Sequence, residues 1–220
     1  MKVLSVNVGV PREVQWRNDR TATAIHKSPV EGRIAAKRLN LDGDRQADLA
    51  VHGGPEKAIY TYPIEHYAYW REELPGVPLP SGVFGENLTI AGLLEPMVRV
   101  GDILRIGTTE LVVTQPRMPC FKLNARFQRG DMVKRFLRSG RTGFYLAVLQ
   151  EGQLGAGDDM ALTPSREQAV TIAEVAALYT TERQNQDLLH RAIRTPALPE
   201  AWREHFRVQL SQLGASARSG

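Results

Sequence analysis

The chain has 220 residues, of which 42% are hydrophobic and 24% are charged, and this balance is ordinary for a soluble globular protein. Its 28 basic and 24 acidic residues leave a net charge of +4, which is too small an excess to indicate nucleic-acid binding by itself. No apolar run approaches the roughly 20 residues that a membrane helix needs, and Met1–Val10 does not read as a signal peptide. The single cysteine excludes an internal disulfide framework and is typical of the reducing cytoplasm, where we expect the protein.

The first three quarters of the chain predict short strands separated by glycine and proline turns. Met1–Val10 alternates polar and apolar residues, which predicts a strand with Leu4, Val6, Val8 and Val10 on one face. Pro63 suits the first position of a helix that runs to about Leu74, and a second short helix is expected at Asp131–Arg138. The other predicted strands are Val14–Ile25, Ala58–Tyr62, Val83–Ile90, Val98–Ile106, Glu110–Thr114, Gly143–Gln150 and Leu154–Thr163. Many short strands with few helices predict a mainly β fold, a closed or nearly closed β-barrel over residues 1–165.

Helical patterns replace the strands after Pro164. Thr171 and Glu174 fit a capping box at the start of the first of three predicted helices. These helices form a small domain of residues 166–211, followed by a frayed tail of residues 212–220. Trp202, Phe206 and Leu210 fall on one helical stripe, which must be buried against the barrel or against a second copy in a homodimer. We expect this domain not to be part of the cofactor site.

The stretch Val113–Lys122 carries the only cysteine, Cys120. Two prolines fix the backbone before it, so we expect the cysteine on a defined turn rather than in a helix. Arg117 and Lys122 flank it with positive charge, which favours the thiolate, the form that attacks electrophiles and binds metals. The alternative is a structural cysteine, because cysteine is among the most often buried residues.

Positive charge gathers around this turn. From Arg117 to Arg141 there are eight basic residues and one acidic residue, Asp131, which gives a net charge of +7. This charge beside the only thiol predicts an anionic partner, and a solvated basic helix face is the alternative. The P-loop, the G-x-S-x-G elbow and the dinucleotide fingerprint are all missing, and one cysteine cannot hold an iron–sulfur cluster. Electrons for a redox reaction would therefore come from another protein.

Four sequence blocks resemble the MOSC family, the domain found at the C-terminus of molybdenum cofactor sulfurases. They are Gly43–Ala58, Gly82–Thr89, Val100–Asp102 and Gln115–Lys122. Along the chain these blocks occur in the same order as in the family. The chain is most similar to the short, stand-alone bacterial members of the YiiM type, which carry a similar three-helix appendage. The resemblance implies a MOSC-type β-barrel, a molybdenum cofactor (molybdenum-molybdopterin) whose metal is held by Cys120, and reduction of N-hydroxylated compounds. Pyridoxal phosphate is not required for this chemistry.

The resemblance also suggests which residues hold the cofactor. Arg117 and Lys122 would contact its phosphate or pterin, arginine being the better bidentate partner. Lys57 is a second candidate for the phosphate, because the preceding Gly53 and Gly54 can present backbone amides to an anion.

Three further polar positions have both a functional and a structural interpretation. His52 would hydrogen-bond the pterin or supply the proton that N–O reduction requires, and the alternative is that it fixes the loop. Asn87 offers a donor and an acceptor to the edges of the pterin. We expect Glu86 to hold an arginine, such as Arg117 or Arg45. Asp44 and Asp48 are expected to cap turns around the same loop.

Three functions stay open at this point. The first is a reductase that takes a small N-hydroxylated substrate and receives electrons from a separate reductase protein. The second is a carrier of the cofactor, or of persulfide sulfur on Cys120, without turnover of its own. The third is a nucleic-acid-binding barrel, but the basic run lacks the interleaved aromatic residues that base stacking needs. We therefore expect neither a nucleic acid nor a membrane as partner.

Overall fold

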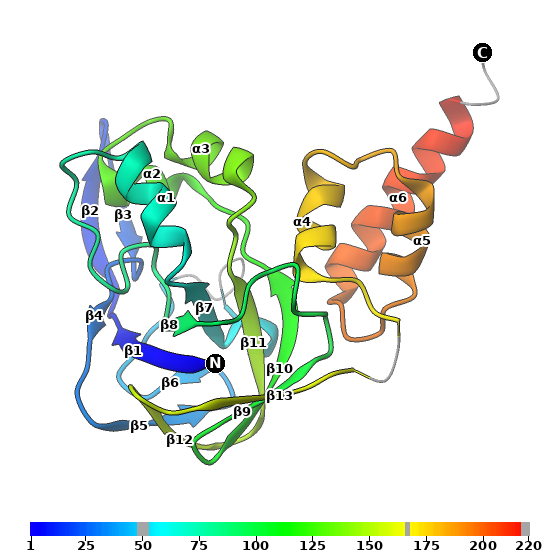
Figure 1. Ribbon diagram of the computed structural model, residues 1–220. Helices are drawn as coiled ribbons and strands as arrows, with labels where there is room; N and C mark the ends of the chain where they lie inside the picture. The colour runs from blue at the N-terminus through cyan, green and yellow to red at the C-terminus, as the bar shows by residue number, and fades with distance from the viewer. Residues whose placement is uncertain (48–52, 166–167, 217–220) are drawn as a thin grey trace.

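The computed structural model describes residues 1–47, 53–165 and 168–216 (Figure 1). Its strands are β1 Lys2–Val8, β2 Arg12–Trp16, β3 Asp19–Thr23, β4 Ser28–Pro29, β5 Arg33–Lys37, β6 Asn40–Leu41, β7 Ile59–Pro63, β8 Leu88–Ala91, β9 Ile103–Ile106, β10 Thr109–Pro116, β11 Phe144–Gln150, β12 Gly152–Gly155 and β13 Met160–Thr163. Its helices are the 3₁₀ turn η1 Pro55–Lys57 and α1 His66–Glu73, α2 Phe121–Phe127, α3 Met132–Ser139, α4 Ile172–Tyr179, α5 Gln186–Ile193 and α6 Glu200–Ser216.

Eight strands form one sheet in the order β13-β9-β10-β11-β7-β8-β1-β4, in which β7 and β8 run parallel and the other pairs antiparallel. The sheet curls until its two ends approach each other. An isolated bridge joins Lys2 to Asp159, and Met160 N donates to Met1 O at 3.0 Å. In the part of the chain that the structure describes, this contact stops short of a continuous ladder, so the predicted barrel is nearly closed rather than closed. The predicted mainly β class with short helices is confirmed.

The first strand shows how local geometry can override a simple alternation. Val3 and Val6 are fully buried, whereas Leu4 is 45% exposed. The pairing of β1 with β8 shifts register between Val3 and Ser5, and such a bulge reverses which face the following residues occupy. The expected buried face that included Leu4 is therefore wrong, although the strand itself is present.

The helices α1 and α3 cover one end of the barrel with a second apolar cluster, built mainly from aromatic rings. As predicted, Tyr67 and Trp70 are buried on the inner side of α1. Tyr62 and Phe84 lie with ring centroids 4.7 Å apart, and Trp70 and Phe136 at 5.9 Å, within the range at which aromatic pairs attract each other. The site residues described below pack against this cluster.

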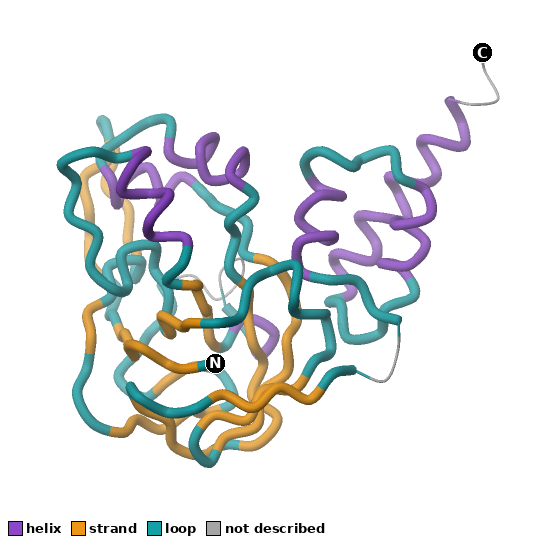
Figure 2. The backbone as a smooth tube through the Cα atoms, viewed as in Figure 1, coloured by secondary structure: helices purple, strands orange, loops and turns teal. Residues whose placement is uncertain are grey.

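The C-terminal helices α4–α6 stand beside the strand-rich body (Figure 2). The predicted capping box is confirmed, since Thr171 Oγ1 accepts from Glu174 N and the Glu174 side chain accepts from Thr171 N. Phe206 is fully buried in the same apolar core as the barrel strands, so its stripe docks on the barrel, one of the two options that the sequence left open. The helix α6 runs to Ser216, beyond residue 211 where we expected the unit to end.

Candidate functional site

Cys120 lies directly before helix α2, as its N-cap residue. Its backbone is extended (φ −124°, ψ 176°), and its carbonyl accepts a hydrogen bond from Leu123 N at 2.9 Å. The thiol is partly accessible and forms no disulfide. The prediction that the cysteine lies outside a helix is confirmed, but helix α2, which begins at the next residue, was not predicted. The prolines on either side of Met118 thus set the place where β10 turns into this helix.

A cavity of about 100 Å³ opens on one side of Cys120, and we call it the basic cavity. Its described lining carries five basic residues and one acidic residue, Asp44, so its net charge is +4. The basic residues are Lys27, Arg45, Lys57, Arg117 and Lys122. An excess of positive charge in a partly enclosed space attracts anions, because little solvent is present to screen it.

Arg117 is the most deeply buried of these cations, with 6% of the residue exposed. Its guanidinium lies 5.3 Å from the ring centroid of Tyr60 and 5.1 Å from that of Phe136. Its Nη1 atom is buried and has no hydrogen-bond partner among the described residues. Because an unpaired buried donor is costly, and a buried charged one more so, such an atom is expected to face a ligand. The chemistry of a guanidinium favours phosphate or carboxylate.

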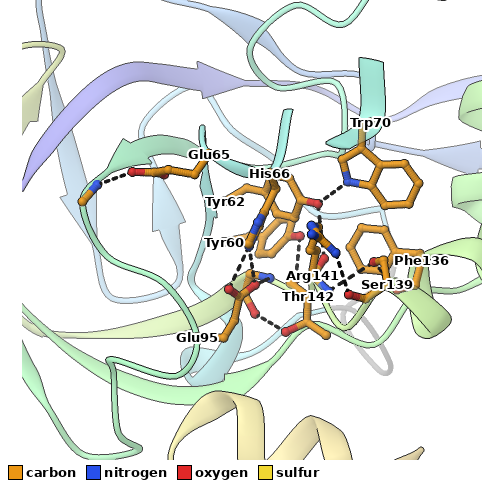
Figure 3. Close-up of polar contacts among 12 residues, drawn as sticks. Tyr60, Tyr62, Glu65, His66, Trp70, Glu95, Phe136, Ser139, Arg141 and Thr142 are labelled. Atoms are coloured by element: carbon orange, nitrogen blue, oxygen red, sulfur yellow. Dashed lines mark hydrogen bonds and ion pairs between the residues drawn. The ribbon is translucent and has the colours of Figure 1, made fainter. Parts of the chain in front are cut away.

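A network behind Arg117 fixes the tyrosine on which it rests (Figure 3). The Tyr60 hydroxyl donates to the carbonyl oxygen of Thr142 at 2.8 Å, and the next residue's amide, Gly143 N, donates to Glu95 at 2.7 Å. Glu95 also contacts His66 Nε2 at 2.8 Å. These bonds connect β7, α1 and the start of β11, so the ring of Tyr60 is held in one orientation.

A buried ion pair forms the opposite wall of the basic cavity. Lys27 Nζ and Asp44 Oδ1 are 2.5 Å apart, and Asp44 Oδ2 accepts from Asn87 Nδ2 at 2.9 Å. Burial lowers the pKa of Lys27, and the nearby Asp44 carboxylate opposes that change. Asn87 Oδ1 accepts from Tyr60 N at 3.1 Å. Asn87 therefore lines the cavity as expected, but its side chain already bonds Asp44 and Tyr60; its contact with a pterin stays a prediction.

Next to the basic cavity, two more buried polar atoms have no hydrogen-bond partner among the described residues: His26 Nε2 and Arg126 Nε. Burial, followed by the charges of Arg126 and Arg12, lowers the pKa of His26 to about 4. His26 is therefore neutral near pH 7. The positive region thus continues from Lys122 along α2 to these side chains, since Lys122 and Arg126 are four residues apart and share one helix face.

The structure gathers some of the predicted residues and not others. Cys120, Arg117, Lys122, Lys57 and Asn87 all line the basic cavity. Gly53 and Gly54 do not belong to the lining that the structure describes, although Gly54 has the positive φ (97°) that favours glycine. His52 and Asp48 lie outside the described residues, so their roles stay predictions.

Two structural expectations need correction. Among the described residues, Glu86 pairs with no arginine: its carboxylate accepts from the Tyr67 hydroxyl and from the amides of Gly82 and Phe84, the latter two at 2.8 and 3.0 Å. Burial raises the pKa of Glu86 despite these bonds. Asp44 does more than cap a turn, because it also accepts from Gly9 N and neutralises Lys27. Both carboxylates stabilise loops around the cavity.

The basic run of residues 117–141 divides into two parts. Arg117, Lys122 and Arg126 belong to or adjoin the cavity, whereas Arg129 and Arg135 both pair with Asp131. Arg129, Arg135 and Asp131 thus form a small ion-pair network in the second part, which Glu73 extends. The sequence showed only the sum of these charges.

A second cavity, of about 270 Å³, lies on the other side of Cys120, and we call it the tryptophan cavity. It is lined by Lys57, Gln115, Pro116, Met118, Pro119, Cys120, Tyr145 and Trp202. Trp202 comes from α6, and its Nε1 donates to Gln115 Oε1 at 2.8 Å. The sequence placed the three-helix unit outside the cofactor site; the unit contributes Trp202 to the tryptophan cavity, and its absence from a cofactor site stays a prediction. No described residue of that unit lines the basic cavity.

Sequence reasoning missed Lys27, Tyr60 and Trp202. The first two come from segments far from Cys120, and no spacing in the sequence places them beside it. Trp202 did carry a signal: an indole on a packed stripe has an N–H group that needs a polar partner. That partner is Gln115, five residues before the cysteine.

Within the described ranges, no three His, Cys, Asp or Glu side chains gather in a way that could hold a metal ion. No described helix is long and apolar enough to cross a membrane.

Comparison with known proteins gives consistent results. A model of the MOSC domain matches residues 48–161, and a model of the YiiM-like 3-alpha helix domain matches residues 170–213. YflK of Bacillus subtilis is 38% identical over 211 residues, which cover 96% of this chain and 95% of YflK. A protein of Gibberella moniliformis named "Reductase" is 38% identical over 143 residues, 64% of this chain and 25% of that protein. The crystal structure of YiiM from Geobacillus stearothermophilus superposes with a TM-score of 0.80 at 36% identity, covering 95% of this chain and 98% of that one.

Proposed function

The chain belongs to the MOSC domain family, which is associated with molybdenum cofactor binding, and we propose that it is a molybdenum-cofactor-dependent reductase of N-hydroxylated compounds. The observation that carries the proposal is the unpaired, buried Nη1 of Arg117 in a cavity of net positive charge that also exposes the only thiol. A related protein that is named a reductase supports the reaction type.

The residues present fit a phosphate-bearing, sulfur-ligated molybdenum cofactor. Arg117 would bind the phosphate, with Lys122 and Arg45 adding charge, because a guanidinium forms bidentate bonds to such groups. Cys120 would supply one thiolate to the metal, which suits a soft sulfur donor. Tyr60 and Phe136 would keep the Arg117 guanidinium in place by their ring contacts.

The bound cofactor would supply the two-electron chemistry, and the protein would position and protonate the substrate. In the overall reaction, R–NHOH, two electrons and two protons give R–NH₂ and water, so the N–O bond breaks. A proton must reach the leaving oxygen. His52 stays the predicted donor, and Lys57 is a second one, because it lines both cavities and burial lowers the pKa of its ammonium group.

Electrons would come from a separate reductase protein. The sequence contains no dinucleotide fingerprint, and its single cysteine cannot hold an iron–sulfur cluster. We expect no turnover with NADH or NADPH alone and robust turnover with chemically reduced methyl viologen.

The test is Cys120→Ala in a host that makes the cofactor, with molybdenum measured per chain and folding checked by circular dichroism. We expect a folded variant that loses both molybdenum and viologen-driven reduction of benzhydroxamic acid. Full molybdenum occupancy in the folded variant would remove Cys120 as the ligand. Wild-type protein that carries molybdenum but reduces no N-hydroxylated compound would support the carrier function instead.

A further inference from the structure

Cys120 separates two cavities of different chemical character. The basic cavity is small and carries five cations, whereas the tryptophan cavity is larger and is lined mostly by apolar and aromatic side chains, with Lys57 as its one cation among the described residues. Lys57, Met118, Cys120 and Tyr145 line both. A ligand on either side therefore reaches the same thiol. An anionic group suits the first cavity and an uncharged, apolar group suits the second.

Trp202 closes the tryptophan cavity and is held there from both sides. Its indole N–H bonds Gln115 Oε1 at 2.8 Å, and its ring contacts Tyr179 edge-on at 5.9 Å between centroids. Gln115 is itself 4% exposed and belongs to β10. The indole is thus held in place where it lines the cavity, because its polar edge is hydrogen-bonded to β10 and its ring packs against Tyr179.

A hollow of about 190 Å³ extends the same surface outward. It is lined by Met118, Tyr179, Ala201, Trp202 and His205. Tyr179 and His205 lie with ring centroids 5.6 Å apart, and Tyr179 is 43% exposed. Three aromatic rings and a methionine therefore line this hollow, which shares Met118 and Trp202 with the tryptophan cavity. An exposed aromatic group of this kind is expected to have a ligand.

The volume of the tryptophan cavity and the charge of the basic cavity decide what this ligand is. An apolar cavity of about 150 Å³ is sufficient to bind benzene in another protein. The tryptophan cavity, at about 270 Å³, can therefore hold a six-membered ring together with the short polar group that it carries. The basic cavity, with five basic residues and one acidic residue in its described lining, is too strongly charged for an apolar ring.

We propose that the tryptophan cavity is the substrate site and that Trp202, contributed by the three-helix unit, selects N-hydroxylated substrates that carry a flat ring. The inference rests on the proposed function, since it takes the basic cavity as the cofactor site. The ring lies against the indole, and the N–O group points towards Cys120. The three-helix unit is thus a specificity element as well as a packing unit.

The test compares two ligands that share one N–O group, benzhydroxamic acid with a ring and acetohydroxamic acid without one. Dissociation constants are measured by titration calorimetry on protein loaded with cofactor. The ratio of the two constants isolates the ring, because any contact of the hydroxamate with the metal is common to both. We expect wild-type protein to favour the ring compound.

Trp202→Leu keeps apolar bulk but removes the indole, and Trp202→Phe keeps a ring but loses the bond to Gln115. We expect the preference for benzhydroxamic acid to fall about 3- to 10-fold in the leucine variant, the size of one aromatic contact, and about twofold in the phenylalanine variant. Trp16→Leu, which alters a half-buried tryptophan of strand β2 outside both cavities, should leave the ratio unchanged. Tyr179→Leu provides a second variant, since its exposed ring can be removed with little effect on folding.

The outcomes separate the two proposals. A lost preference without reduction of either compound by reduced methyl viologen would overturn the reductase and support the ring site. Reduction of both compounds with an unchanged ratio in folded Trp202→Leu and Tyr179→Leu proteins would overturn the ring site and leave the reductase standing. Equal binding of both compounds by wild-type protein would also overturn the ring site.

Discussion

Two halves of one basic segment behave differently in this structure. In residues 117–126 the cations face or adjoin a cavity, and two of them, Arg117 and Arg126, have a buried nitrogen without a partner among the described residues. In residues 129–141 three of the four arginines have partners within the protein: Arg129 and Arg135 pair with carboxylates, and Arg141 lies 3.9 Å from the ring centroid of Tyr69. A run of basic residues in the sequence therefore forms a binding site only where the fold places no carboxylate against those residues.

The largest expected effect comes from matched changes at two arginines, one from each half. Arg117→Gln should lower cofactor affinity about 10- to 100-fold, because it removes a charge-assisted bond from a buried site. Arg135→Gln should leave cofactor content unchanged and affect thermal stability only slightly, because that ion pair is partly exposed to solvent. Molybdenum per chain, measured by mass spectrometry after expression in a host that makes the cofactor, gives the comparison.

Phosphate supplies a second measurement for the same pair. Excess inorganic phosphate should raise the unfolding temperature of cofactor-free wild-type protein and of Arg135→Gln, because a ligand that binds only the folded state stabilises it. Folded Arg117→Gln protein should lose this response. Equal stabilisation of all three proteins would show that the two halves of the segment do not differ in anion binding.

A smaller difference in phosphate affinity is expected between variants at two lysines. Lys122 lines the basic cavity, and Lys134 is exposed on α3. Lys122→Ala should weaken phosphate binding about 2- to 5-fold, and the loss should shrink at high salt, because a partly exposed charge is screened by ions. Lys134→Ala should leave phosphate binding unchanged. Titration calorimetry at two salt concentrations tests both variants, and equal effects would refute the division of the segment.

The same comparison shows what could be predicted from the sequence and what could not. Strands β1, β7, β10 and β11 and the capping box at Thr171 follow from local patterns, since alternation and capping depend on neighbouring residues. Arg117 and Lys122, chosen because they lie near Cys120 in the chain, line the same cavity as Cys120, and their contact with a cofactor stays a prediction. Pairing partners such as Glu73 for Arg135 lie 62 positions apart, and no local pattern encodes such a distance.

The residues that line the basic cavity but come from distant segments of the chain were not predicted, for the same reason. Lys27 and Tyr60 reach the basic cavity only because β7 and the loop before β4 are brought together by the sheet order. Glu86 was expected to bind an arginine, but its oxygens accept from nearby amides and a tyrosine instead. Hydrogen bonds within its own loop and to Tyr67 therefore satisfy this carboxylate, and among the described residues Arg117 Nη1 has no hydrogen-bond partner.

The smallest expected effect concerns His26, which adjoins the first half of the segment. Burial and the charges of Arg126 and Arg12 lower its pKa to about 4, whereas in the unfolded chain it titrates near 6.5. The unfolded state therefore binds more protons between these values, so this histidine lowers stability as pH falls from about 6.5 towards 4 and has no such effect above 6.5. Because the side chain is only half-buried, solvent screens the interaction, and we expect a contribution of about 1 kcal/mol at pH 4.

Urea unfolding at pH 7 and pH 4.5 of wild-type protein and His26→Gln measures this contribution. The variant should lose less stability between the two pH values, while His190→Gln, which changes an exposed histidine of α5, should match wild type. Excess phosphate provides a further test, because an anion beside Arg126 and Arg12 would offset their charges and raise the pKa of His26. In excess phosphate the wild-type protein should therefore approach the variant. A pH dependence that phosphate leaves unchanged would show that the anion does not reach this end of the basic region.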